Sequence, residues 1–166
     1  MIQQAWYEVL FSGTGIALLG AAFAAFMAGM GSSKGVGIVG EAASGLVSEN
    51  PDRFGQCLLL QALPGTQGIY GLLIAFVILN NLGLLNGSWE PISLATGFSY
   101  FVAALPIGFV GYFSAIAQGR VAASGIGIIA KRSEDLAKGI TFAAMVETYA
   151  VLALLTSILM IFFGIK

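Results

Sequence analysis

One carboxylate lies inside a long apolar segment in the second half of the sequence. Between Gly139 and Ile165 the only charged residue is Glu147. An ionised carboxylate inside a bilayer is costly, so a lone membrane Glu marks a candidate functional site, one that can take up and release a cation or a proton. The alternative is a structural Glu that stays permanently protonated.

A glutamine falls at the same predicted depth as this carboxylate. Glu147 lies as far after Ser133 as Gln118 lies before Arg132. If the polar segment between Gln118 and Glu147 contains a tight turn, two antiparallel helices carry both side chains about 21 Å from it, at about 1.5 Å per residue.

The first half of the sequence repeats this spacing. Gln67 follows Arg53 by the same number of residues, and Leu63, Thr66 and Tyr70 share its neighbourhood. Several oxygens that converge at one level suit a hard cation. For the amides and the hydroxyl, the alternative role is hydrogen bonding between helices.

Pro64 lies beside this polar group. A proline within a helix removes a backbone hydrogen bond and distorts the turn. Irregular backbone in mid-membrane offers carbonyl oxygens to an ion. Counting back four residues frees the carbonyl of Leu60, but this rule leaves open which carbonyl faces the site.

The composition indicates how these residues are positioned. Of 166 residues, 58% are hydrophobic and 9% are charged, against about 25% charged in a soluble domain. A spanning helix needs about 20 mostly apolar residues. The uncharged segments predict an all-α integral membrane protein with four transmembrane helices, at about 13–48, 54–84, 95–131 and 135–164. These helices form two hairpins, over 1–85 and 86–166.

The same composition excludes several function classes. A net charge of −1 offers no basic surface for nucleic acid. The sequence has no His and one Cys, which excludes histidine catalysis, a histidine or cysteine metal site, and an internal disulfide. It contains no phosphate-binding loop of the Walker type. We therefore expect a non-catalytic membrane protein.

The two hairpins look like a duplication. Each has a long Gly- and Ala-rich helix, a turn, and a bulkier helix, and Gly68-Ile69-Tyr70-Gly71 aligns with Glu147-Thr148-Tyr149-Ala150. Gly68 then stands where Glu147 stands in the second hairpin, which predicts one ion per chain. Small-residue stripes on the first and third helices let backbones approach closely. They indicate either packing inside a four-helix bundle or an inner ring built from many copies.

Basic residues predict the orientation in the membrane. They flank the first and third connections and are Arg53, Lys131, Arg132 and Lys138. The positive-inside rule then places both hairpin turns in the cytoplasm and both termini outside. Aromatic anchors on the predicted outer side agree with this, and they are Trp6, Tyr7 and Trp89.

Two further cations fall deep in the predicted helices. Lys34 lies well before Asn50 and Arg120 well before Arg132, which puts them about 18–24 Å from the turns. Charges at that depth avoid lipid tails, so we expect both to face the central opening of a ring. The competing interpretation is an ion pair between Lys34 and Glu147.

Three motifs carry a resemblance to a known family. They are Leu63-Pro64-Gly65-Thr66-Gln67-Gly68-Ile69-Tyr70-Gly71, Ile116-Ala117-Gln118-Gly119 and Met145-Val146-Glu147-Thr148-Tyr149. In this order they resemble the membrane rotor proteolipids of V-type ATPases, the K or c subunits, in the sodium-pumping bacterial branch. The resemblance covers essentially the whole chain.

The resemblance implies a homo-oligomeric ring in a bacterial cell membrane. The ring carries ions past a stator membrane subunit that supplies a cation, with membrane lipids around it. A central-stalk subunit binds at the cytoplasmic turns, and another subunit hydrolyses ATP. The family's sodium ligands fall on the Leu63 carbonyl, Thr66, Gln67, Gln118 and Glu147, and Tyr70 matches the tyrosine that hydrogen-bonds the carboxylate.

Other functions fit parts of the pattern. In a proton-carrying rotor of the same family, Glu147 would simply protonate. A free-standing four-helix transporter would use Glu147 to bind organic cations, although the Gly-rich stripes and the lack of a wide aromatic pocket count against it. A purely structural membrane bundle or channel is the remaining alternative.

Overall fold

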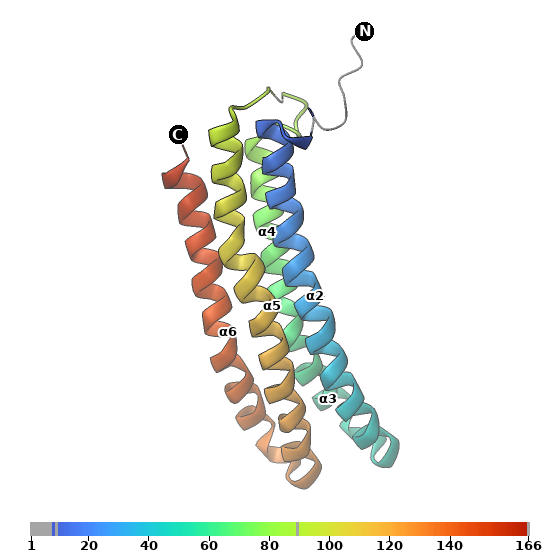
Figure 1. Cartoon of the computed structure of the whole chain (residues 1–166). Coiled ribbons are helices and arrows are strands. Elements are labelled where there is room, and N and C mark those ends of the chain that lie inside the picture. Colours follow the sequence, from blue (N-terminus) through green and yellow to red (C-terminus); the bar gives the residue numbers. More distant parts are fainter. Residues whose placement is uncertain (1–7, 9, 89, 166) are drawn as a thin grey trace.

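The computed structural model describes residue 8 and residues 10–88 and 90–165. Within these residues, four helices are long and apolar enough to cross a membrane, as the sequence predicts. The two hairpin turns lie at one end of the bundle and the connection between the hairpins lies at the other (Figure 1). The aromatic anchors Trp6, Tyr7 and Trp89 fall outside the described residues.

The helices follow one another as two hairpins. The first hairpin consists of α2 (Gly13–Glu49), a 3-10 turn (Pro51–Arg53), α3 (Phe54–Ala62), a second 3-10 turn (Leu63–Gly65) and α4 (Thr66–Asn81). The second consists of α5 (Leu94–Lys131), a 3-10 turn (Ser133–Asp135), α6 (Leu136–Leu159) and a final π-helical turn (Met160–Gly164). With 37 and 38 residues, α2 and α5 are each about 55 Å long and exceed a hydrocarbon core of about 30 Å.

The helix expected over 54–84 is interrupted. Pro64 cannot donate a backbone hydrogen bond, and the chain forms a 3-10 turn in which the Thr66 N–H bonds to the Leu63 carbonyl. The helix resumes as α4 and ends at Asn81, three residues earlier than expected. Gly83 follows with φ of +72°, a left-handed conformation that commonly terminates helices.

A second proline lies within α5 without ending it. Pro106 is inside the helix, and the N–H of the next residue, Ile107, donates to the Ser157 hydroxyl at 3.3 Å. Ser157 is completely buried on α6. A side chain from the neighbouring helix therefore satisfies backbone that the proline disturbs.

The long helices α2 and α5 pack through their small residues. A Cβ atom built on Gly31 would lie 2.5 Å from the Cα of Tyr112, and one built on Gly119 would lie 2.6 Å from the Cα of Gly35. No larger side chain fits at these positions without moving a backbone. The small-residue stripes thus bring the first and third helices together within one chain, as close packing in lipid requires.

We expect Gly119→Ala to destabilise the protein by about 1–3 kcal/mol, the usual cost of overpacking a tight contact. The added methyl group would meet the backbone of Gly35. Thermal unfolding in detergent, followed by helical circular dichroism, measures the effect. Gly127→Ala on the same helix is the matched control, because nothing lies within 4 Å of its added Cβ. Equal melting temperatures for the two variants would contradict the packing described.

Candidate functional site

The Glu147 carboxylate is half-buried on α6 and receives two hydrogen bonds. The Tyr70 hydroxyl on α4 donates to Oε1 at 2.7 Å, and the Gln118 amide on α5 donates to Oε2 at 3.3 Å. Both donors are neutral. The carboxylate is therefore fixed in orientation by groups from two other helices while its negative charge is not balanced by them.

Two glutamines form the buried centre of the site. Gln67 and Gln118 are both completely buried. The Gln67 Nε2 donates to the Gln118 Oε1 at 2.6 Å, and the Gln118 Nε2 also donates to the Ala143 carbonyl at 3.1 Å. Because a buried amide without partners is costly, these bonds hold both side chains at one level.

The helix interruption supplies the next oxygens. The Thr66 hydroxyl shares its single proton between the Leu63 carbonyl oxygen at 3.0 Å and the Gln67 Oε1 at 3.3 Å. The same Leu63 carbonyl accepts the Thr66 N–H in the 3-10 turn. Counting residues back from Pro64 did not decide which backbone carbonyl faces the site. In the structure, the Leu63 carbonyl lies within the polar group and contacts Thr66 directly.

One continuous hydrogen-bond network joins all six residues singled out in the sequence. It runs from the Leu63 carbonyl through Thr66, Gln67 and Gln118 to Glu147 and ends on Tyr70. Counting residues from the turns predicts that the two glutamines and the glutamate share one membrane level, and the structure places them in contact.

Ser114 belongs to the same network, although the sequence analysis missed it. Its hydroxyl accepts from the Gln67 Nε2 at 3.4 Å and donates to the Val146 carbonyl at 3.2 Å. Ser114 lies one helical turn before Gln118 on α5, so the i to i+4 spacing of a helix face was the available signal. A lone serine in a membrane helix is a weak signal, because its hydroxyl commonly bonds its own backbone.

Lys34 does not pair with Glu147. Its ammonium group donates to the Tyr112 hydroxyl at 2.8 Å and lies 5.2 Å from the centre of that ring. Among the described residues, the one salt bridge joins Lys138 to Asp135 at 2.8 Å. The competing interpretation of a Lys34–Glu147 ion pair is therefore wrong. Lys34 and Arg120 are both exposed in the single chain, and whether they face a central opening stays a prediction.

A cavity reaches Glu147 from the exposed side of α6. It has a volume of about 410 Å³ and is lined by Ala144, Glu147, Thr148, Val151 and Leu152. The carboxylate thus has the buried amides on one side and an open apolar hollow on the other. Glu147 is therefore accessible from the exposed face of α6 without unpacking α4 from α5.

The donor set of the site suits a monovalent hard cation. It offers one carboxylate together with carbonyl, amide and hydroxyl oxygens, which are the ligands of hard ions. No cluster of three or more His, Cys, Asp or Glu residues able to hold a metal occurs in the described part of the chain. A single carboxylate balances one positive charge, which fits a monovalent ion better than a divalent one.

Comparison with known proteins gives the family. The model of the family of ATP synthase C subunits matches the chain twice, over residues 19–78 and 101–160. The chain belongs to this family, the membrane rotor proteolipids of rotary ATPases. These proteolipids are not catalytic themselves, because ATP is hydrolysed in other subunits of the complex.

Individual relatives carry names from several branches of rotary ATPases. The chain is 52% identical to the V-type sodium ATPase subunit K of Enterococcus hirae, over 87% of this chain and 89% of that one. It is 37% identical to the A-type ATP synthase subunit K of Methanocaldococcus jannaschii, over 86% of this chain and 60% of that one. It is 32% identical to the V-type proton ATPase 16 kDa proteolipid subunit of Chrysotila carterae, over 56% and 57%.

The two family matches also correct the register of the duplication. The matches begin at residues 19 and 101, and the 3-10 turns of the two hairpins begin at Pro51 and Ser133. Both pairs are therefore 82 residues apart. With this offset the repeat counterpart of Glu147 is Gly65 and not Gly68, since the alignment on one short motif was three residues out of register. Either counterpart is a glycine, so each chain still has one carboxylate at this level.

Proposed function

We propose that this protein is the sodium-carrying subunit of a rotor ring, with one sodium ion bound per chain. The observation that carries the proposal is the network that joins oxygens from three helices to the lone carboxylate Glu147. The proposed ligands are the Leu63 carbonyl, Thr66, Gln67, Gln118 and Glu147. The name of the Enterococcus hirae relative, a sodium ATPase subunit, supports the same ion.

Charge balance explains how such a site works. With sodium bound, the carboxylate and the ion together are neutral, so the loaded site can pass through lipid at low cost. Without the ion, Glu147 is a half-buried carboxylate within the membrane that must find another positive partner. Tyr70 keeps the carboxylate oriented in both states, because its hydroxyl already donates to Oε1.

The surroundings of the site follow from this mechanism. Copies of the chain, each with hairpins over 1–85 and 86–166, form the ring, and a stator membrane subunit supplies a cation that displaces sodium from Glu147. A central-stalk subunit binds at the hairpin turns. The Lys and Arg residues beside these turns support a cytoplasmic position for them, with both termini outside, and the bacterial relative supports a bacterial cell membrane. The exposed cavity beside Glu147 supports release toward the stator.

Sodium is expected to protect Glu147 from a hydrophobic carbodiimide. The reagent modifies protonated carboxyl groups, and a bound sodium ion competes with the proton that the reaction requires. Labelling of the purified ring, measured by mass spectrometry of the Glu147 peptide, should fall as sodium is raised. Potassium at the same ionic strength is the control for a general salt effect.

The rival ion gives a different result. If protonation alone loads the site, labelling depends on pH and not on sodium from micromolar to molar concentrations. That outcome would favour the proton-carrying rotor. An oligomer that is no larger than a dimer after detergent extraction would instead favour a small free-standing transporter.

A further inference from the structure

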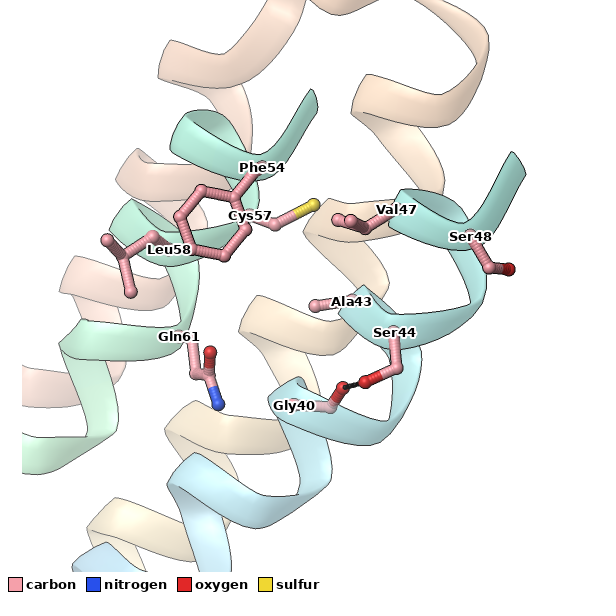
Figure 2. A pocket seen from close by; sticks show the side chains of 9 residues that line it. All are labelled: Gly40, Ala43, Ser44, Val47, Ser48, Phe54, Cys57, Leu58 and Gln61. Carbon is pink, nitrogen blue, oxygen red and sulfur yellow. Dashed lines mark hydrogen bonds between the residues drawn. The ribbon is translucent and has the colours of Figure 1, made fainter. Parts of the chain in front are cut away.

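A cavity in the first hairpin lies away from the ion site. It has a volume of about 470 Å³ between α2 and α3, and Figure 2 shows Ala43 on one wall with Cys57 and Gln61 on the other. All the residues that line it belong to these two helices. The Gln61 amide makes no hydrogen bond to any other described residue. We refer to this space as the α2–α3 cavity.

The second hairpin has the same groove, but there it is filled. In the second hairpin, the residues equivalent by the repeat to Ala43 and Cys57 are Gly125 and Gly139. The end of the Leu60 side chain lies 3.3 Å from a Cβ built on Gly125 and 3.4 Å from one built on Gly139. Leu60 is 0% exposed. Within one chain, the first hairpin therefore docks on the second by inserting Leu60 between α5 and α6.

The repeat also identifies the side chain that matches the vacant groove. The counterpart of Leu60 is Phe142 on α6, which is 59% exposed. Further along the same face, Tyr149 is the counterpart of the completely buried Gln67, yet it is 67% exposed. The face of α6 that projects away from the chain is thus the repeat image of the face that α3 and α4 bury.

We propose that Phe142 of one copy occupies the α2–α3 cavity of the adjacent copy, against Ala43 and Cys57. The proposal rests on the ring of the proposed function, and it continues the interface that the two hairpins of one chain already form. In a closed ring every hairpin then packs on the next hairpin with the same geometry. Contacts within a chain, made by Leu60, alternate with contacts between copies, made by Phe142. Filling the cavity with the phenylalanine ring adds dispersion contacts, and such packing drives helix association in lipid.

Charges at the end of the groove agree with the same docking. Within one chain, the Gln56 amide donates to the Ser133 carbonyl at 3.1 Å. Their counterparts are Lys138 and Pro51, and Pro51 is followed by Asp52. Lys138, which pairs with Asp135 of its own chain at 2.8 Å, then lies beside Pro51 and Asp52 of the next copy, where its ammonium group finds a carbonyl and a second carboxylate. The same turn carries Arg53, which has Asp52 as its neighbour.

The contact between copies holds no second ion site. The counterparts of Gln118 and Glu147 at that contact are Val36 and Gly65, which offer neither an amide side chain nor a carboxylate. The two kinds of hairpin contact in the ring thus differ in chemistry although their packing is the same.

Cross-linking tests the contact, because Cys57 is the only cysteine in the sequence. In Phe142→Cys, a short aromatic bis-maleimide applied to the assembled ring should join Cys57 of one copy to the new cysteine of the next. A denaturing gel should then show dimers and higher multiples with loss of the monomer band. The reagent is preferable to oxidation, because it does not demand disulfide geometry.

The matched control is Thr141→Cys, which has nearly the same depth on α6 but points about 100° away. It should leave the monomer band, as should Phe142→Cys combined with Cys57→Ala. An intact ring in which Phe142→Cys gives no multiples overturns the proposed contact and leaves the rotor function standing. If the unaltered chain forms no ring, the proposed function itself fails.

A second variant keeps the aromatic ring at the contact, in case the cysteine variant does not assemble. Benzoylphenylalanine in place of Phe142 should, on irradiation, attach to the peptide that carries Ala43 or Cys57 of another copy. Attachment only to lipid, or only to other peptides, would also overturn the contact.

Discussion

Glu147→Gln is expected to abolish ion transport by the ATPase complex and to leave the ring assembled. Glutamine keeps the shape of the side chain, and its single amide oxygen can accept from Tyr70, which donates to Oε1 of the carboxylate at 2.7 Å, while the hydrogen bond from Gln118 to Oε2 at 3.3 Å is lost. Glutamine carries no charge, however, so it can neither form a neutral pair with sodium nor exchange a bound sodium ion for the stator cation. Sodium uptake into vesicles containing the whole complex measures the loss.

The control for this variant is Glu90→Gln. Glu90 is exposed in the connection between the two hairpins, away from both the proposed ion site and the hairpin turns, so its variant should transport at the parental rate. Native gels of both variants should show the same oligomer as the parent. Transport by Glu147→Gln at the parental rate would mean that the carboxylate is not the carrier.

The common level of the proposed ion ligands was predictable because hairpin geometry is simple. Antiparallel helices rise equally from a turn, so residue counting alone places Gln118 beside Glu147. Gln67 came to the same level by the same count, although its helix is interrupted at Pro64. A single 3-10 turn changes the rise by only a few ångströms, which a long glutamine side chain can absorb.

Rotation about a helix axis was harder to predict than depth. The ion pair of Lys34 with Glu147 required Lys34 to face α6, whereas its partner is Tyr112 of the neighbouring long helix. Depth follows from the constant rise of a helix, whereas direction needs the packing partner of each face. For the same reason the residue count alone does not decide between the carbonyls of Leu60 and Leu63, because that choice depends on the geometry of one turn; the family resemblance is what indicates Leu63.

The alignment of one short motif was also not enough to determine the register of the duplication. A match of four residues around Tyr70 and Tyr149 is outweighed by the agreement of both family matches and both turns. The corrected register matters, because it relates the filled groove at Leu60 to the vacant one. The cavity and the exposed Phe142 needed three-dimensional packing to be recognised.

Gln118→Leu is expected to weaken sodium binding about 5- to 150-fold. The change removes one oxygen ligand, removes the amide that donates to Glu147, and leaves the buried Gln67 Nε2 with only a 3.4 Å contact to Ser114. Loss of one polar contact to the bound ion costs about 1–3 kcal/mol of binding free energy, which gives this range of dissociation constants. Radioactive sodium binding to the purified ring measures it directly.

Gln61→Leu is the matched control, because it makes the same change on a glutamine outside the network. Gln61 lines the α2–α3 cavity and bonds to no ion ligand, so its variant should bind sodium as the parent does once ring assembly is confirmed. Gln118→Asn separates chemistry from reach, since it keeps the amide but shortens it by one methylene, and should fall between the parent and Gln118→Leu. If Gln118→Leu binds sodium as tightly as Gln61→Leu, the amide only holds the helices together and is not a ligand.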